Sequence, residues 1–269
     1  MSGFSADWLA LREPFDLRAR NPTVLAAVAG LFEHQHSVRV IDLACGTGST
    51  LRALSPRLPP RQSWILVDND PNLLARAAAM PTSQDVTVTA VARDLSDDLE
   101  PALGGAVDLV ATSALLDLVS EAWLHRVAIA VTARAIPFYA ALSYDGRVAF
   151  SPPDPFDAAV VGAVNLHQRT DKGFGAALGP ASADLALTRF AALGYAVAQG
   201  AADWQIGPED RDMQTALVDG WARAARDIGT QSGQDITEWL ARRRAAIAAG
   251  RSSLLVGHVD FFAVPSVTR

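Results

Sequence analysis

The chain contains a single cysteine, Cys45, among 269 residues. One cysteine excludes a disulfide within the chain and any metal site that needs several thiolates. The five histidines show no spacing typical of metal ligands, so we expect no bound metal. Cys45 falls in a glycine-containing turn that requires small residues, and we interpret it as a packing residue.

Basic charge and long apolar runs are also scarce. The net charge is −6 and the pI is about 5.3, which argues against broad binding of nucleic acid. No uninterrupted apolar stretch approaches the roughly 18–20 residues of a membrane span. Met1–Asp7 lacks the basic and apolar regions of a secretory signal. We therefore expect a cytoplasmic protein, a monomer or a homodimer, that binds neither nucleic acid nor a membrane.

Hydrophobic residues, by contrast, make up 50% of the chain, which is enough for a sizeable core. Up to Gly146, short apolar runs that predict strands alternate with helical patterns, as is typical of βαβ units in a parallel sheet. The predicted strands are 38–43, 64–68, 86–92, 107–112, 137–143, 195–198 and 253–264. The predicted helices are 5–20, 23–34 (capped by Asn21), 50–58, 71–80, 121–133, 182–193, 208–228 and 235–249 (with Asp235 and Glu238 as a capping box).

Residues 40–51 are the most informative segment and read Val-Ile-Asp-Leu-Ala-Cys-Gly-Thr-Gly-Ser-Thr-Leu. An apolar strand ends in an acidic residue, passes through a turn with two glycines and opens a helix. Glycines belong in such a turn because a side chain would block a ligand or forbid a positive φ. The dinucleotide pattern G-x-G-x-x-G fails here, because its third glycine position is Leu51.

The pattern D-x-A-x-G-x-G resembles motif I of the class I S-adenosylmethionine (SAM) dependent methyltransferases, of the type that acts on small molecules. Acidic residues also follow the next two predicted strands, Asp68 after 64–68 and Asp94 after 86–92. Three acids after three successive strands is the arrangement of that family. The resemblance covers residues 38–145 most fully.

The resemblance implies a single α/β domain over 1–269, with a Rossmann-like, doubly wound sheet. Seven mostly parallel strands are expected in the order 3-2-1-4-5-7-6, with strand seven antiparallel. Residues 1–37 would form an N-terminal helical lid. The segments 151–180, rich in proline and glycine, and 208–249 would be insertions that cap the acceptor.

The resemblance also implies a set of cofactor ligands. Asp42 would help to hold the amino acid end of SAM, and the backbone at Gly46 and Gly48 would approach the cofactor closely. A carboxylate such as Asp68 can accept both ribose hydroxyls, and Asp94 would accept the adenine amine. The remaining expected ligands are Ala44, Asn69, Leu95, Ser113 and an arginine of the first helix, Arg18 or Arg20.

Acceptor residues are less evident from the sequence. His167 is the most plausible general base, and Asp117, in the loop after the fourth strand, is a second candidate for acceptor binding or proton transfer. The other candidates for the acceptor site are Tyr144, Arg169, Asp171, Trp204 and Gln205.

The sequence therefore predicts transfer of a methyl group from SAM to an O, N or C atom of a small molecule, with S-adenosylhomocysteine as the product. Three alternatives stay open. One is an NAD-dependent oxidoreductase, which Leu51 and Asp94 disfavour. The second is a non-catalytic SAM-fold binding protein. The third is an aminopropyltransferase, which would need a cluster of acids for a polyamine near the acceptor loops, where none is seen.

Overall fold

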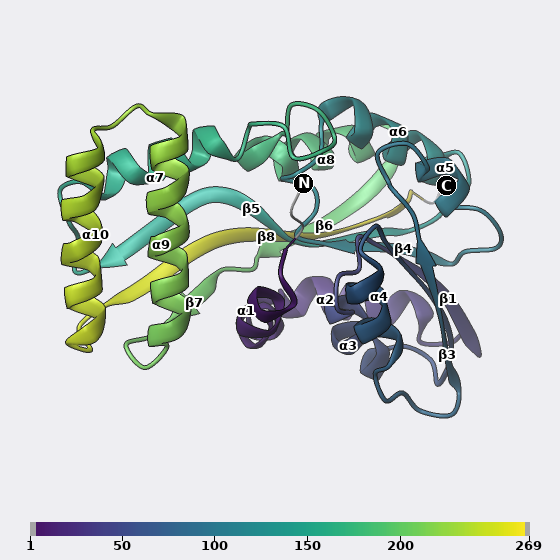
Figure 1. The fold of residues 1–269 in the computed structure, drawn as a ribbon. Helices are drawn as coiled ribbons and strands as arrows, with labels where there is room; N and C mark the ends of the chain where they lie inside the picture. Colours follow the sequence, from purple (N-terminus) through teal and green to yellow (C-terminus); the bar gives the residue numbers. More distant parts are fainter. Residues whose placement is uncertain (1–3, 267–269) are drawn as a thin grey trace.

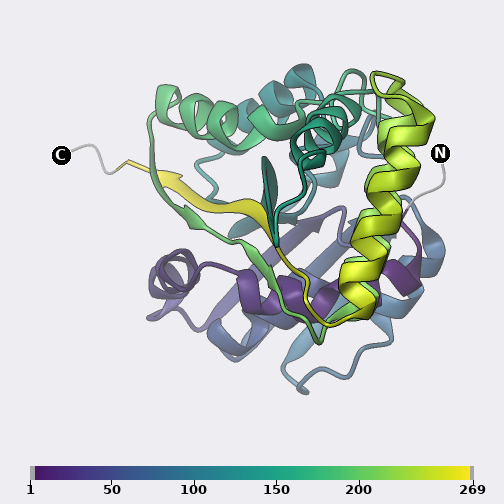
Figure 2. The same cartoon turned by 90° about the vertical axis from the view of Figure 1, so that its left-hand side faces the viewer.

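The structure is a computed structural model that describes residues 4–266. Residues 1–3 of the predicted N-terminal lid lie outside this range. A central sheet of eight strands separates two layers of helices (Figures 1 and 2). The strands are β1 (Ser37–Leu43), β2 (Arg61–Asp68), β3 (Val86–Ala92), β4 (Leu109–Ser113), β5 (Phe138–Ser151), β6 (Tyr195–Ala201), β7 (Trp204–Ile206) and β8 (Ser253–Pro265).

The sheet has the order β3-β2-β1-β4-β5-β8-β6, and only β8 runs antiparallel to its two neighbours along this path. This is the predicted Rossmann-like order, with β8 as the seventh strand of the prediction. The prediction missed β7, a short strand that pairs with β8 between Trp204 and Ile206. Three residues give too short a pattern to indicate a strand.

Helices follow most of the predicted ranges. They are α1 (Ala6–Ala19), α2 (Pro22–Phe32), α3 (Ser49–Leu54), α4 (Pro71–Ala78), α5 (Leu99–Ala102), α6 (Glu121–Thr132), α7 (Asp157–His167), α8 (Ser182–Ala192), α9 (Arg211–Ile228) and α10 (Gly233–Ala248), with 3-10 turns at Ser55–Arg57 and Gly179–Ala181. The predicted cap of α2 is confirmed, since Asn21 Oδ1 accepts the N–H groups of Thr23 and Val24. The predicted capping box of α10 is wrong, because Ser232 Oγ caps the helix and it begins earlier.

Each face of the sheet carries its own apolar cluster, because side chains alternate along a strand. Ile41 and Leu43 pack with residues of α5, α6 and α8, the upper layer in Figure 1. Val38 and Val40 pack with residues of α2, α3 and α4, the lower layer. The carboxyl ends of the parallel strands are left free between the layers, where α/β proteins place their ligand crevice.

The predicted end of the fifth strand at residue 143 is wrong. Strand β5 continues to Ser151 beside β8, with a register shift between Tyr144 and Val148. Gly146 lies in this irregular stretch at φ +87°, and a Cβ there would lie 2.9 Å from Pro180 Cβ. The glycine that seemed to end the strand pattern therefore bends the strand instead.

The two predicted insertions meet on this extension of the sheet. Helix α7, from the first insertion, packs against α9, and α9 packs against α10, both from the second (Figure 1, left). Their shared apolar cluster includes Val160, Val218 and Trp239. Most prolines of this segment lie before α7 and most of its glycines lie after it, so they are outside the helix. The segment 151–180 is therefore more regular than its composition indicated.

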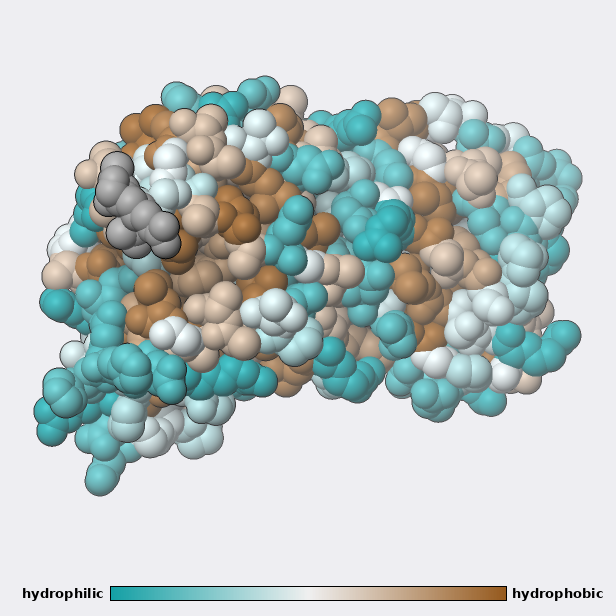
Figure 3. All heavy atoms as spheres, turned by 180° about the vertical axis from the view of Figure 1, so that it is seen from behind, coloured by the Kyte–Doolittle hydropathy of each residue, from teal (hydrophilic) through white to brown (hydrophobic). Residues whose placement is uncertain are grey.

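One face of the molecule shows apolar side chains gathered between hydrophilic margins (Figure 3). The large apolar side chains that are exposed in residues 4–266 come from several elements. They are Phe4, Leu17, Leu31, Ile129 and Leu166. Exposed apolar residues of this kind are common on globular proteins and do not by themselves define a site.

A buried ion pair holds α7 to α10. Asp157 accepts hydrogen bonds from Arg243 Nε (3.0 Å) and from Trp239 Nε1 (2.9 Å). The Arg243 guanidinium also donates to the carbonyl of Pro152 and lies 4.2 Å from the ring centroid of Phe150. This pair closes the cap over the sheet extension.

We expect Asp157→Ala to lower the free energy of unfolding by about 3–5 kcal/mol, because it leaves a buried guanidinium unpaired. Urea unfolding of the full chain measures the change. Arg244→Ala is the matched control. Arg244 lies on the exposed side of α10 and pairs with Asp219 of α9. Equal effects of the two substitutions would contradict the structural role of the Asp157 pair.

Candidate functional site

The glycine turn joins β1 to α3 at the carboxyl edge of the sheet. Gly46 and Gly48 have φ values of +53° and +84°, which side chains disfavour. A Cβ at Gly46 would lie 3.3 Å from Leu9 Cδ1 of α1, and one at Gly48 would lie 3.1 Å from Met80 Cε. The turn therefore requires glycine for its backbone angles, and there is little room for a side chain.

Residues other than glycine also have positive φ angles at this edge of the sheet. Ala44, Ala114 and Leu142 have φ values of +55°, +51° and +54°. They follow β1, follow β4 and lie within β5, three neighbouring strands. Such conformations cost about 1–3 kcal/mol each and cluster at functional sites. The structure thus places strained backbone where the sheet opens toward a ligand.

Asp42 is fully buried at the end of β1, and neither of its carboxylate oxygens has a hydrogen-bond partner in residues 4–266. Burial raises its pKa to about 7, although the nearby Arg20 guanidinium and the Thr50 side chain oppose this shift. A buried carboxylate without a donor is costly in free energy. The site is therefore suited to a ligand that brings a hydrogen-bond donor or a positive charge.

Arg20 caps the carboxyl end of α1, and its side chain lies near Asp42. Its guanidinium donates to Tyr139 Oη (3.1 Å) and, at longer distances, to Ser49 Oγ (3.4 Å) and Ser113 Oγ (3.3 Å). Its Nε has no partner among the described residues. A second contact fixes α1 over the turn, because Arg52 of α3 pairs with Glu13 and also donates to the carbonyl of Thr47.

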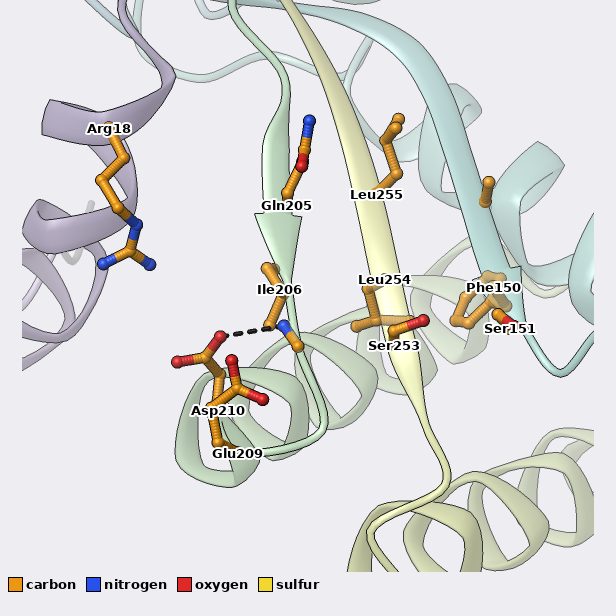
Figure 4. A pocket seen from close by; sticks show the side chains of 12 residues that line it. Arg18, Phe150, Ser151, Gln205, Ile206, Glu209, Asp210, Ser253, Leu254 and Leu255 are labelled. Carbon is orange, nitrogen blue, oxygen red and sulfur yellow. Dashed lines mark hydrogen bonds between the residues drawn. The ribbon is translucent and has the colours of Figure 1, made fainter.

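Arg18, the other arginine predicted for this role, lies elsewhere. It is exposed, and its Cζ lies 4.6 Å from the ring centroid of Phe15. It lines an open groove of about 640 Å³ together with Gln205 and Asp210 (Figure 4). None of the glycine-turn residues lines this groove. The structure therefore does not bring Arg18 to the turn, and it places Gln205, predicted for the acceptor pocket, in this groove.

The predicted ribose ligand, Asp68, is buried at the end of β2 beside the glycine turn. Its carboxylate accepts the N–H groups of Gly46 (2.8 Å) and Asp70 (3.0 Å). Asn69, which follows it, is exposed. These bonds tie the end of β2 to the turn after β1 and hold the carboxylate at the crevice.

The predicted adenine ligands follow β3. Asp94 is exposed, and its Oδ1 accepts bonds from the N–H and the hydroxyl of Ser96. The side chain of Leu95 is buried, and its carbonyl accepts a bond from Trp123 Nε1 (2.6 Å). The loop is thus held firmly against α6.

Cys45 has a buried thiol within the same turn. Burial and the neighbouring carboxylates of Asp42 and Asp68 raise its pKa. The thiol stays protonated and unreactive at neutral pH. This agrees with the interpretation of Cys45 as a packing residue.

A smaller cavity of about 150 Å³ includes Ala114 in its lining, and we call it the acceptor cavity because residues predicted for the acceptor line it. It is lined by residues of the sheet, of α1 and of the cap. They are Phe4, Trp8, Arg12, Ala114, Asp117, Leu118, Leu142, Tyr144, Val164, Gln168, Trp204, Leu217, Trp221, Val256 and His258. Three of the predicted acceptor residues, Asp117, Tyr144 and Trp204, meet here.

Asp117 is the carboxylate of this cavity. It is fully buried, and its Oδ1 has no hydrogen-bond partner in the described part of the chain. Burial raises its pKa to about 6, against the opposing charges of Arg12 and Lys172. The group is therefore ionised near neutral pH and remains close to its titration range.

Four other predicted acceptor residues do not line the cavity: Gln205, which lies in the open groove, and His167, Arg169 and Asp171. His167 ends α7, with Nδ1 3.3 Å from Lys172 Nζ and Nε2 3.8 Å from Asp227, and burial lowers its pKa. Arg169 is exposed. Asp171 accepts the N–H groups of Gly173 and Gly175 in its own loop. Helix α7 presents Val164 and Gln168 to the cavity instead.

His258 was missed in the sequence. Its Nδ1 lies 3.1 Å from the carbonyl oxygen of Val256, so Nδ1 donates and Nε2 is left as an acceptor. Its ring centroid lies 4.7 Å from that of Trp204. Burial, with the positive charge of Arg12, lowers its pKa to about 3. The imidazole is therefore a neutral hydrogen-bond acceptor at physiological pH.

Arg12 and Asp16 form a buried pair on α1, with Nε 2.9 Å from Oδ2. Asp16 also accepts Trp204 Nε1 (3.0 Å), and the Arg12 guanidinium lies 5.0 Å from the Trp204 ring centroid. The pair joins α1 to β7 and closes one wall of the acceptor cavity. Its charges balance each other.

In residues 4–266, no group of three or more His, Cys, Asp or Glu side chains comes together as a metal site. No helix in that range combines the length and the apolar character needed to cross a bilayer.

Residues 40–135 match the family model of the methyltransferase domain. The fold is similar to that of a cyclopropane-fatty-acyl-phospholipid synthase-like protein from Lactobacillus casei, with 14% identity, a TM-score of 0.50, and 97% of this chain and 95% of that chain covered. It is also similar to the YcgJ protein from Bacillus subtilis, with 16% identity, a TM-score of 0.48, and 91% and 99% covered.

A further similar structure is a SAM-dependent methyltransferase from Geobacter sulfurreducens in complex with S-adenosylhomocysteine, with 17% identity, a TM-score of 0.46, and 98% and 100% covered. A search of curated protein sequences found no significant match. The family match covers the glycine turn and the strands β1 to β4, and the observed sheet order is the one that the sequence motif predicted. Over residues 40–135, the chain is therefore similar to the methyltransferase domain family.

Proposed function

We propose that this protein transfers a methyl group from SAM to a small-molecule acceptor that binds in the acceptor cavity. The observation that carries the proposal is the pair of unsatisfied buried groups at the glycine turn, the Asp42 carboxylate and Arg20 Nε. They lie at the edge of the sheet from which an aromatic-lined cavity opens.

The amino acid end of SAM carries both an ammonium group and a carboxylate. Asp42 has two free acceptor oxygens for the ammonium, and Arg20 has a free donor for the carboxylate. Asp68, Asp94 and the N–H of Leu95 remain the proposed ligands of ribose and adenine. Leu9 of α1 and Met80 lie close to the two glycines, so a larger residue is disfavoured at either position.

Bound there, SAM would supply a methyl group that is already activated for transfer. The protein's own contribution is then to position the acceptor and to exclude water. Trp8 and Arg12 of α1 close the acceptor cavity on one side, and Leu217 and Trp221 of α9 close it on another. This supports the proposed role of the N-terminal helix and of the two insertions as a cap over the acceptor.

The proposal is tested by calorimetric titration of the full chain with SAM, S-adenosylhomocysteine and NAD. We expect micromolar binding of the first two and none of NAD. Binding of NAD alone would favour the oxidoreductase alternative. The absence of binding by all three would contradict the proposal.

Asp68→Asn should weaken SAM binding by more than about tenfold, because charged hydrogen bonds are worth roughly 1.5–3 kcal/mol. Calorimetry gives the dissociation constant, and urea unfolding checks that the variant is folded. Asp108→Asn is the control, since Asp108 accepts a backbone N–H at the opposite end of the sheet. Unchanged affinity in Asp68→Asn would remove Asp68 from the site.

SAM affinity should rise with pH up to about 7.5. Since the pKa of Asp42 is raised to about 7, the carboxyl is mostly protonated at pH 6 and must lose its proton to bind an ammonium group. One titrating group of this pKa gives a rise in affinity of roughly eightfold from pH 6 to pH 7.5. The ligand's own amine, with a pKa of about 7.7–8.0, begins to lose its proton in this range and reduces the expected rise to roughly five- to sixfold.

The matched variant for this experiment is Asp42→Asn, which keeps the shape of the side chain but cannot titrate. Its SAM affinity should be weaker and should not rise with pH over the same range. The same pH dependence in both proteins would show that another group titrates.

A further inference from the structure

We propose that the acceptor is a one-ring aromatic compound with a phenolic O–H or an arylamine N–H as nucleophile, and that Asp117 accepts its proton. This inference rests on the proposed methyltransferase function and names the class of acceptor for that same site.

The size of the acceptor cavity sets the first limit. Its volume is about 150 Å³. Clefts for drug-sized ligands are usually about 300–1,000 Å³, whereas an engineered apolar cavity of about 150 Å³ in another protein holds benzene. The acceptor cavity therefore fits one aromatic ring, and a long acyl chain or a nucleoside would extend beyond it.

The lining of the cavity sets the second limit. Trp8, Trp204, Trp221 and Tyr144 surround it, and Trp8 and Trp204 already meet edge-on at 6.5 Å between ring centroids. Aromatic rings pack favourably in such offset and edge-on arrangements. A flat apolar ring thus gains more from this cavity than a saturated or strongly polar molecule of equal size.

The unpartnered polar atoms of the cavity set the third limit. Asp117 Oδ1 has no partner among the described residues, and Nε2 of His258 is left as an acceptor. Tyr144 donates its hydroxyl to Asn165 Oδ1 at 2.8 Å, and Arg12 binds Asp16 through Nε and Nη2. The acceptor should therefore bring a hydrogen-bond donor, and an anionic compound would be repelled by Asp117.

Asp117 is a better proton acceptor than His258. The groups that face it are Arg12 of α1, Lys172 of the loop after α7, Tyr144 of β5 and His258 of β8. With its pKa raised to about 6, Asp117 is ionised at pH 7.5 yet basic enough to take a proton. His258, with a pKa lowered to about 3, cannot hold one and instead orients the acceptor.

The proposed methyl transfer needs only SAM, the acceptor and Asp117. A lone pair on the acceptor's oxygen or nitrogen forms the bond to the methyl carbon while the carbon–sulfur bond breaks. The electron pair of that bond goes to sulfur and neutralises its positive charge. The proton of the acceptor's O–H or N–H passes to Asp117 and then to water.

The test measures S-adenosylhomocysteine formed by the full chain from SAM with phenol or aniline at pH 7.5. Cyclohexanol, benzoate and 2-naphthol are the comparators for aromaticity, charge and size. We expect saturable turnover with phenol, aniline or both, and at least tenfold lower kcat/KM with every comparator. Turnover of a comparator equal to that of the one-ring donors, or no turnover of phenol and aniline, would overturn the inference.

Asp117→Asn then tests the proton acceptor. General base catalysis contributes about 10²–10⁴-fold, so kcat should fall at least a hundredfold while the SAM dissociation constant and the KM of the aromatic acceptor change less than threefold. At saturating SAM, the wild-type kcat/KM for the aromatic acceptor should rise through about pH 6 and then level off, and in the variant it should be flat. Asp212→Asn, an exposed acid on α9, is the control.

The outcomes separate the two proposals. Failure of the wild type to bind SAM would overturn the methyltransferase proposal itself. Normal SAM binding without the expected acceptor preference would overturn only the class of acceptor. Wild-type turnover in Asp117→Asn would remove Asp117 as the base, and the wild-type pH profile tests the same point if the variant does not fold.

Discussion

One buried carboxylate, Asp260 of β8, holds the two halves of the site together. Its Oδ1 accepts the N–H of Leu142 (2.7 Å), and its Oδ2 accepts the N–H of Asn21 (2.9 Å). The first bond fixes β5 at Leu142, which has a positive φ and lines the acceptor cavity. The second fixes the junction of α1 and α2 directly after Arg20. Both N–H groups need a partner, because an unsatisfied buried donor costs about 1–3 kcal/mol. One side chain thus fixes the backbone beside Arg20, the proposed cofactor ligand, and the backbone of Leu142 in the wall of the acceptor cavity.

The positions of the proposed cofactor residues in the fold could largely be predicted from the sequence, because their signals are local. Asp42, Gly46 and Gly48 lie within one strand–turn–helix segment, and Asp68 ends the next strand, so the pattern and the sheet order together place them at one edge. The arginine of α1 shows the limit of such reasoning. Arg18 and Arg20 are two residues apart and point to different sides of the helix end, and only the tertiary contacts with Tyr139 and Ser113 distinguish them.

The acceptor side could not be predicted in the same way, because it is assembled from distant segments. His258 and Asp260 lie in an apolar strand, where the sequence indicates burial but not which cavity or partner each side chain meets. His167 was the more obvious base in the sequence because it lies in a polar stretch, yet α7 turns it away from the cavity that Val164 and Gln168 line. Helix α7 itself was not predicted, because prolines precede it and glycines follow it in the sequence.

Buried carboxylates also make this site a source of instability in the free protein. The folded-state pKa values of Asp42 and Asp117 are raised from 3.8 to about 7 and about 6. A raised pKa means that the folded state holds its proton more tightly than the unfolded state. This contribution to stability is fully present below about pH 4 and is lost as the pH rises through 6 and 7. At neutral pH the free protein therefore carries charges that only a ligand with donors can satisfy. The strained residues Ala44, Ala114 and Leu142 add to this cost. Both features lie where the cofactor and the acceptor are proposed to bind, and a bound ammonium or phenol would satisfy the carboxylates. The cost of the site to folding and its fitness for binding thus have the same physical origin.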